Sequence, residues 1–297
     1  MTKDEEKFCG GLTGLGWSDL LIRKPQEEKF CDKYNGWALM TGENWLELLK
    51  ERPKFRAKAE KYVNGIAALI ALYPNTADSF TPGEEFGGWE WQVILAHAPQ
   101  FDEKCNELGA WALFNSANWT NLLRSRPEFE GKLNEYSNWE NINWALLLAD
   151  QPQFAHYCDE LNKWDTLGET YFSGDDWAYL LSKQPQFAKK CDEVDGWHYK
   201  CDLSEEVEGW EMNGSIWEEY NFERLLEAQP QFAYKLDELN AWKYFSGLEW
   251  LPLLKKRPEF ADKCDKANGW WYFTDEDWEE LLKAQPRLKS YRRSPKD

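Results

Sequence analysis

The feature that most constrains the fold is a fourteen-residue phrase that recurs along the whole chain. It reads MTGENWLELLKERP at residues 40–53 and FTDEDWEELLKAQP at residues 273–286. A tandem repeat with a period of roughly 20–50 residues predicts units that bury their apolar faces against their neighbours. The prolines that close the phrase mark ten copies, and each copy is named below by its marker proline: Pro25, Pro53, Pro74, Pro99, Pro127, Pro152, Pro185, Pro230, Pro258 and Pro286.

Two columns of large side chains keep a fixed distance from the marker proline. Every copy has a large apolar residue eight positions before the proline, usually Trp, and seven copies have a second Trp twelve positions after it. The two columns account for 15 of the 19 tryptophans. Aliphatic residues lie five and four positions before each proline, so Trp, Leu and Leu share one helical face. We therefore interpret the tryptophans as core residues.

Polar residues within the phrase predict where its helices begin and end. Thr41 with Asn44 and Ser173 with Asp176 have the spacing of a capping box, and Ser246 with Glu249 and Thr274 with Asp277 repeat it. The marker proline ends this long helix and suits the first turn of a second, shorter one. Asn or Asp before Gly-Trp or Ala-Trp then predicts a helix C-cap and a turn.

These elements predict an all-α fold, an α-solenoid of about ten short helix-kink-helix repeats. Helices of roughly 8 to 11 residues are too short to be stable alone in water, so each must pack on its neighbours. We expect residues 1–297 to form a single repeat domain. A leucine-rich-repeat horseshoe is the alternative, because it shares a period of roughly 20–29 residues. The capping boxes and the absence of an alternating L-x-L strand argue against it.

The pattern W-x-x-L-L-x-x-x-P-x-F-A-x-K-C-D resembles the units of uncharacterised bacterial Trp-rich tandem-repeat proteins. Leu180-Leu181 and PQFAKKCD at residues 185–192 illustrate it. The resemblance covers nearly the whole chain and implies a repeat fold. It implies no activity, cofactor or binding residue.

Composition narrows the classes of partner. The chain carries 53 acidic and 35 basic residues, a net charge of −18, which disfavours direct binding to nucleic acid or to an anionic membrane and favours a basic protein partner. No apolar run is long enough to span a bilayer, and the N-terminus has no signal-peptide pattern. Seven cysteines without regular pairing fit reduced thiols, so we expect a cytoplasmic protein. Because polar end caps keep a repeat protein from associating with itself, we also expect it to be monomeric when free.

The sequence offers no catalytic, metal or cofactor motif. The cysteines of the repeat alternate with Leu and Ala at the same position, which favours small buried side chains over nucleophiles. His198 and Cys201 are three residues apart and would supply half of a zinc site. We therefore predict a protein that is not an enzyme and that has no metal and no cofactor.

The longest interruption of the repeat is the best candidate for a contact surface. Between Pro185 and Pro230 the spacing grows to 45 residues, and residues 198–216 form an insertion. Residues 192–223 contain eleven acids and one base, Lys200, for a net charge of −10. Insertions in repeat proteins often line the binding face, and aromatic side chains anchor interfaces. The candidate partner-binding residues are Trp197, Tyr199, Asp202, Glu205, Glu206, Glu208, Trp210 and Glu211.

Three functions remain open from the sequence. The first is a non-enzymatic scaffold or adaptor that binds a basic protein through this acidic, aromatic patch. The alternative is a nucleic-acid-mimicking inhibitor, whose carboxylates would take the place of phosphates on a nucleic-acid-binding protein. A small-molecule-binding or enzymatic repeat protein is a third possibility. We expect residues 287–297 to be a basic tail that forms a polar end cap.

Overall fold

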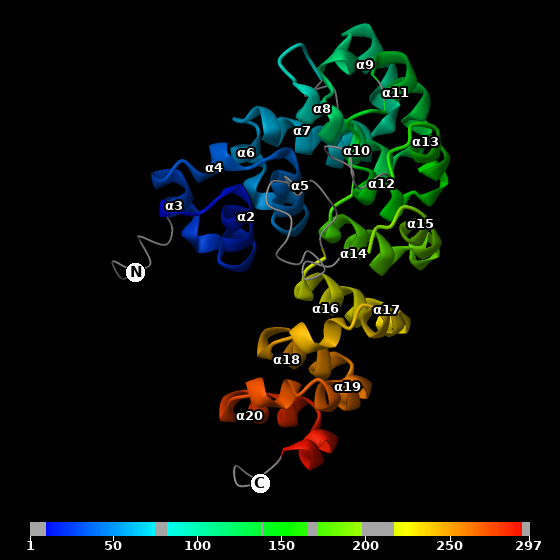
Figure 1. Cartoon of the computed structure of the whole chain (residues 1–297). Helices are drawn as coiled ribbons and strands as arrows, with labels where there is room; N and C mark the ends of the chain where they lie inside the picture. Colours follow the sequence, from blue (N-terminus) through cyan, green and yellow to red (C-terminus); the bar gives the residue numbers. More distant parts are fainter. Residues whose placement is uncertain (1–9, 75–81, 138, 165–171, 198–216, 293–297) are drawn as a thin grey trace, which may run out of the picture. The chain divides into compact units, whose positions relative to one another are not determined.

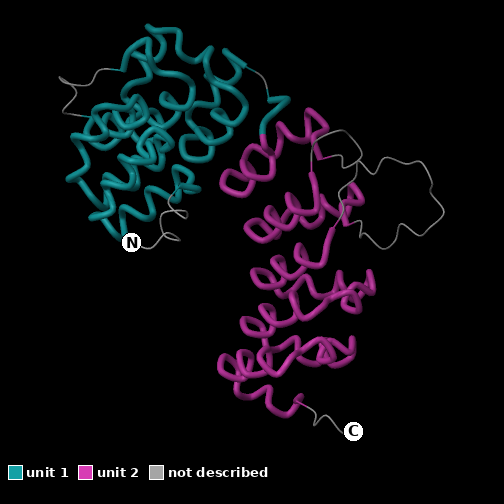
Figure 2. The backbone as a smooth tube through the Cα atoms, turned by 90° about the vertical axis from the view of Figure 1, so that its left-hand side faces the viewer, with its two compact units in different colours: residues 1–142 teal, residues 143–297 magenta. Residues whose placement is uncertain are grey.

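The computed structural model describes residues 10–74, 82–137, 139–164, 172–197 and 217–292. Every element in these ranges is an α-helix or a 3₁₀-helix, which confirms the all-α prediction (Figure 1). These ranges contain none of the strands that a leucine-rich repeat would need. The chain divides into two compact units, unit 1 with residues 1–142 and unit 2 with residues 143–297 (Figure 2).

The long helix of each copy packs on the long helix of the next copy within its unit. In unit 1 these helices are α2 (Gly14–Arg23), α5 (Gly42–Glu51), α7 (Val63–Leu72), α8 (Gly88–His97) and α10 (Ser116–Ser125). In unit 2 they are α12 (Trp144–Asp150), α14 (Gly174–Lys183), α16 (Glu219–Ala228), α18 (Gly247–Lys256) and α20 (Asp275–Ala284), which follow one another in Figure 2.

In the described ranges, shorter helices follow every long helix except α7, after which residues 75–81 are not described. In unit 1 these are η1 (Pro25–Glu27), α3 (Glu28–Lys33), α4 (Gly36–Leu39), η2 (Pro53–Phe55), α6 (Arg56–Ala59), η4 (Pro99–Phe101), α9 (Asp102–Glu107), η5 (Ala110–Leu113), η6 (Pro127–Phe129) and α11 (Glu130–Tyr136). In unit 2 they are η7 (Pro152–Phe154), α13 (Ala155–Glu160), η8 (Pro185–Phe187), α15 (Ala188–Glu193), η10 (Pro230–Phe232), α17 (Ala233–Glu238), η11 (Ala241–Tyr244), η12 (Pro258–Phe260), α19 (Ala261–Lys266), η13 (Gly269–Tyr272) and η14 (Pro286–Tyr291).

The capping boxes predicted from the sequence are present. At the start of α14 the Asp176 amide donates to Ser173 Oγ at 3.2 Å, and the Ser173 amide donates to Asp176 Oδ2 at 2.9 Å. α5, α18 and α20 begin with the same pairing at Thr41, Ser246 and Thr274. These bonds satisfy amides that the first helical turn leaves without a partner.

The marker prolines open a 3₁₀ turn, not the short α-helix itself. Pro185 is the first residue of η8, and the short helix α15 starts three residues later at Ala188. Proline is favoured there because the first helical position needs no amide hydrogen. The short helix then ends at a residue in the left-handed conformation. Asn35, Asp195, Asn240 and Asn268 do so as their place before Gly-Trp or Ala-Trp predicted, and Gly109 and Asn162, which lack that signal, adopt the same conformation.

The two tryptophan columns stack on each other. Trp111 lies on Trp119 with ring centroids 5.3 Å apart and an interplanar angle of 9°, and Trp242 lies on Trp250 at 5.4 Å and 12°. In each pair the second Trp of one copy meets the first Trp of the next copy. All tryptophans of the two columns are buried except Trp270, which is half-buried, so the tryptophans form the core between successive copies.

A polar bond also joins successive copies. The residue just before the marker proline donates its side chain to a backbone carbonyl near the end of the preceding long helix, as Arg126 does to Ala96 O at 2.8 Å. This bond satisfies a carbonyl that the helix end leaves without a partner. Equivalent bonds run from Arg52 to Ile22, Gln184 to Ala149, Gln229 to Ser182, Arg257 to Glu227 and Gln285 to Lys255.

Candidate interaction face

The edge formed by the short helices is closed by contacts between copies. Lys263 Nζ binds Asp237 Oδ2 at 2.7 Å, Trp242 Nε1 donates to Asp237 Oδ1 at 2.8 Å, and the ammonium lies 5.9 Å from the Trp242 ring centroid. Lys58 with Asp32 and Trp37, and Lys190 with Asp159 and Trp164, repeat this arrangement. These lysines and aspartates are therefore paired with each other within the chain.

Two contacts between copies continue across the acidic insertion. Gln229 donates to Ser182 O at 2.9 Å, and Lys235 binds Asp192 at 2.7 Å, while Trp197, in the same copy as Asp192, donates to that carboxylate at 2.9 Å. α14 and α16 pack directly on each other. The array of helices therefore passes from residue 197 to residue 217 without a break in its packing.

Trp217 resumes the core directly after the insertion. Its ring lies 4.8 Å from that of Trp197, and its Nε1 donates to Gly196 O at 2.7 Å. Trp217 occupies the position before the cap, where other copies have Phe, and Phe222 occupies the position where they have Trp. The larger and the smaller aromatic residue are thus interchanged in this copy. Their ring centroids lie 4.7 Å apart, so the aromatic core of this copy stays packed.

The structure places Trp197 in the core, with 6% of its surface exposed. The contact surface proposed below therefore leaves Trp197 out. The other seven candidate residues lie outside the described residues, as do His198 and Cys201: Tyr199, Asp202, Glu205, Glu206, Glu208, Trp210 and Glu211.

Part of the acidic cluster is neutralised by bases that are distant in the sequence or just outside the cluster. Asp192 is paired with Lys235, and Glu193 lies 3.4 Å from Lys189 and 3.2 Å from Lys190. Hydrogen bonds from Lys190 and Lys189 hold the pKa of Glu193 below its usual range. The net charge of −10 counted over residues 192–223 thus overstates the charge that this segment offers to a partner.

Among the described residues, each long helix also has side chains that lie away from the core. We call the positions ten and six residues before the marker proline the outward face of each long helix. In unit 2 the outward face of α14 to α20 is formed by Asp175, Tyr179, Tyr220, Arg224, Leu248, Pro252, Glu276 and Glu280.

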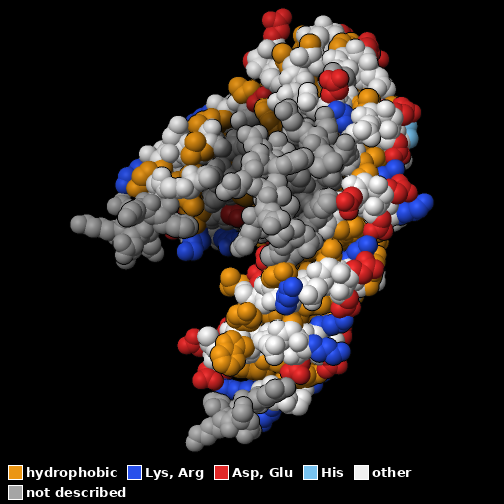
Figure 3. Space-filling model, in the orientation of Figure 1, with side chains coloured by type: hydrophobic (Ala, Val, Ile, Leu, Met, Phe, Trp, Pro, Cys, Tyr) orange, Lys and Arg blue, Asp and Glu red, His pale blue; other side chains and the backbone are white. Residues whose placement is uncertain are grey.

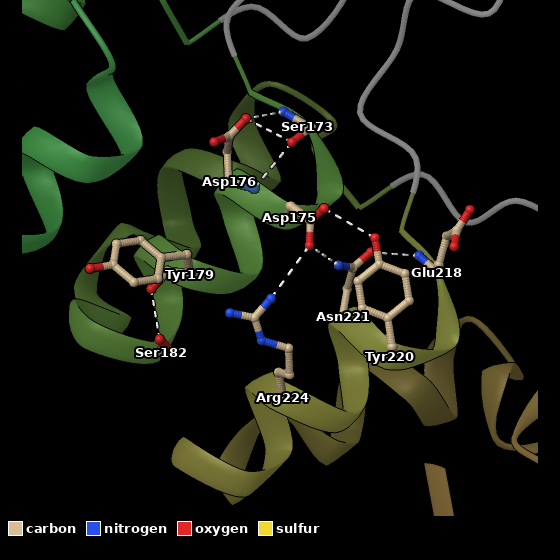
Figure 4. A network of polar contacts seen from close by, with 9 residues as sticks. All are labelled: Ser173, Asp175, Asp176, Tyr179, Ser182, Glu218, Tyr220, Asn221 and Arg224. Carbon is tan, nitrogen blue, oxygen red and sulfur yellow. Dashed lines mark hydrogen bonds and ion pairs between the residues drawn. The ribbon is translucent and has the colours of Figure 1, made fainter. Parts of the chain in front are cut away.

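Asp175 is the centre of a polar network on this face (Figure 4). Tyr220 donates to its Oδ2 at 3.0 Å, Asn221 Nδ2 donates to its Oδ1 at 2.8 Å, and Arg224 lies 3.6 Å from Oδ1. Burial and the bond to Asp175 raise the pKa of Tyr220, so its hydroxyl stays protonated. The network ties α14 to α16 beside residue 217, where the chain resumes after the insertion.

Beyond this network the outward face exposes Leu248, which is 83% exposed, and the neighbouring short helix η13 exposes Trp271 at 90% and Tyr272 at 51%. Leu248, Leu251, Pro252, Tyr272 and Asp277 line a hollow of about 310 Å³ between α18 and the start of α20. In Figure 3 hydrophobic side chains gather along this edge of unit 2, whereas charged side chains gather on the edge of α17 and α19.

Unit 1 has its own hollow on the same side of its long helices. It measures about 730 Å³ between α2 and α5 and is lined by Leu15, Ile22, four acids, two bases and His97. Glu43 Oε2 lies 3.9 Å from His97 Nε2, and this contact keeps the pKa of Glu43 below its usual range. In both units a hollow therefore lies on the outward side of the long helices.

The cysteines of the described ranges lie in the core. The five cysteines found there are unpaired and buried, and burial raises the pKa of Cys31 and Cys105 to about 12. Residues 10–74, 82–137, 139–164, 172–197 and 217–292 bring together no group of three His, Cys, Asp or Glu side chains that would hold a metal. Within the same ranges, no helix has the length and apolarity needed to cross a membrane.

Glu223 is an unusual acid on α16. Burial raises its pKa to about 8, and the neighbouring Glu227 adds to the effect, while Lys256 opposes it. Glu227 itself pairs with Lys256 on α18. Glu223 is therefore largely protonated near neutral pH, which removes one more negative charge from the cluster counted in the sequence.

No protein-family model, curated protein or solved structure matches this chain.

Proposed function

We propose that this chain is a cytoplasmic α-solenoid of about ten copies, spanning residues 1–297 as one repeat domain, that binds a basic protein and catalyses no reaction. The support for the repeat array is the recurrence of the same three contacts between copies within each unit. The free, buried thiols support a reducing compartment. At the C-terminus η14 buries Leu288 and packs Tyr291 5.2 Å from Trp270, which supports an end cap and a monomer when free.

One observation carries the binding proposal. Trp197 and Trp217, the residues on either side of the insertion, stack on each other. The contacts between copies continue from the Pro185 copy to the Pro230 copy. We infer that the helices can pack without these nineteen residues. The described chain resumes at residue 217, just before α16, whose Tyr220 and Arg224 are exposed on the outward face. An acidic insertion there is placed to steer a basic protein onto that face. The contact we propose comprises Tyr199, Asp202, Glu205, Glu206, Glu208, Trp210 and Glu211.

The structure suggests a clean test of this proposal. In the Pro230 copy two residues, Lys243 and Tyr244, join Trp242 to Phe245. Replacing residues 198–216 by Lys-Tyr would shorten the 45-residue spacing to 28, the commonest value in the chain. We expect the shortened chain to keep its helix content and its midpoint of thermal unfolding, but to lose a basic partner that the intact chain recovers in a native pull-down with mass spectrometry. Recovery should also fall at high salt, since the attraction is electrostatic.

A second variant separates charge from length. It keeps the insertion but neutralises it with Asp202→Asn, Glu205→Gln, Glu206→Gln, Glu208→Gln and Glu211→Gln, and it should lose the partner as well. Recovery of the same partner by all three chains would rule out the insertion as the contact. Competition of DNA or RNA for the partner would instead favour the nucleic-acid-mimicking alternative.

A further inference from the structure

The hollow beside α18 has a backbone feature that the equivalent long helices lack. Pro252 lies inside α18, at the sixth residue of a helix that begins at Gly247. Proline has no amide hydrogen, so the carbonyl of Leu248, four residues earlier, is left without its regular helical donor. Leu248 is also the most exposed aliphatic side chain in the described ranges, at 83%. A carbonyl without its regular helical amide donor therefore belongs to the same residue as an exposed apolar side chain.

The rim of the hollow is acidic. α20 begins with Asp275, Glu276 and Asp277, followed by Glu279 and Glu280. The nearby bases already have acidic partners: Lys255 pairs with Glu280, Lys256 with Glu227, and Arg292 with Asp275 at 2.6 Å. Glu276, at the outward position of α20, is exposed and adds negative charge to the rim. The surroundings of the hollow are thus complementary to a cation beside an apolar group.

We propose that this hollow binds an apolar side chain of a basic, amphipathic helix from the partner protein, and that a Lys or Arg of the same helix donates to the Leu248 carbonyl. The inference rests on the proposed protein-binding function. A hollow of about 310 Å³ is at the lower limit for small-molecule sites and suits one side chain. Leu251, Pro252 and Tyr272 provide its apolar walls, and Asp277 lines it with a carboxylate that would attract a cationic neighbour. Glu276, the residue before Asp277, and Trp271, the residue before Tyr272, are both exposed.

A defined probe tests this directly on the full chain. The probe is a fluorescein-labelled amphipathic peptide of about four helical turns, with Leu on one face and Lys on the other. We expect fluorescence anisotropy to show binding that weakens by about tenfold or more in Leu248→Ser and in Tyr272→Ser. Pro252→Ala should also weaken it, because the new amide occupies the Leu248 carbonyl. Leu113→Ser is the matched control, since Leu113 has the place of Tyr272 in the Pro99 copy and is 53% exposed.

Several results would overturn the proposal. Equal affinity of the intact chain and the two hollow variants would place the peptide elsewhere, and so would equal binding of a peptide in which Ala replaces every Leu. Binding of a Leu–Glu peptide as tight as that of the Leu–Lys peptide would contradict the cationic partner. Absence of binding by the Leu–Lys peptide would also refute it. Circular dichroism checks that each variant is folded, as expected for changes at exposed positions.

The two proposals can fail separately. If recovery of the pull-down partner depends on residues 198–216 but is unchanged by Leu248→Ser and Tyr272→Ser, the hollow is not the binding site and the proposed binding function stands. If the peptide binds the hollow but no basic protein depends on the insertion, the function proposed for the insertion is wrong and the hollow stands.

Discussion

Replacing Trp177 by alanine should lower the free energy of unfolding by about 3–5 kcal/mol, the range for deleting a large aromatic side chain from a core. Trp177 is fully buried, stacks on Trp164 at 5.9 Å, and contacts Phe172 at 4.6 Å. Its neighbours have little freedom to fill the space, because Trp164 is bonded to Asp159 and the chain after Phe172 is fixed by the capping box of α14. Denaturant unfolding followed by circular dichroism measures the loss.

Two controls in the same chain sharpen this prediction. Trp177→Phe should cost less than Trp177→Ala, because Phe keeps part of the buried aromatic volume and because the buried Trp177 Nε1 has no hydrogen-bond partner to lose. It should still cost stability, since the larger residue that accompanies Phe222 in the Pro230 copy, Trp217, is Phe172 here. Trp271→Ala, at a 90% exposed position, should change stability by less than about 0.5 kcal/mol. Similar losses for Trp177→Ala and Trp271→Ala would show that the tryptophan columns are not the core.

Pro252→Ala should stabilise the chain, by up to about 3 kcal/mol. The substitution supplies an amide hydrogen for the Leu248 carbonyl and removes the clash of the proline ring with the preceding turn. Removing the proline also raises the entropy of the unfolded chain, which offsets part of this gain in stability. The same denaturant titration measures the gain as a shift of the unfolding midpoint, with an unchanged dependence of the free energy on denaturant concentration.

Pro258→Ala is the matched control for this prediction. Pro258 is the first residue of η12, where the missing amide hydrogen costs nothing, so its removal should bring no gain. A Pro252→Ala chain that is no more stable than the parent would mean that the Leu248 carbonyl already has a partner within α18. The gain expected at Pro252 also fits a functional role, because a binding position that lowers stability is a common compromise.

The local features of the fold follow from the sequence because each depends on residues close together in the chain. The capping box of α14 needs only Ser173 and Asp176, and the left-handed turn needs only a residue such as Asn240 that tolerates that conformation. The burial of Trp45 and Trp119 follows from their spacing with the leucines on one helical face.

Contacts between copies were not predictable in this way. Asp192 belongs to the acidic cluster in the sequence, yet it binds Lys235, 43 residues away, because the next copy starts only after the insertion. The Pro230 copy has Trp217 and Phe222 in each other's usual positions. Its sequence therefore looks irregular, although its two aromatic rings pack on each other. The outward face also escapes a search for repeated residue types, because it changes from Asp175 to Tyr220 to Leu248 while the core stays constant.

The central claim is that a partner binds the outward face of the long helices, next to the acidic insertion, and not the edge formed by the short helices. Hydrogen–deuterium exchange of the intact chain, with and without the basic protein recovered in the pull-down, tests it most directly. We predict slower exchange on binding in α14, α16 and α18, and little change in α15, α17 and α19. Slower exchange confined to the three short helices would contradict the account.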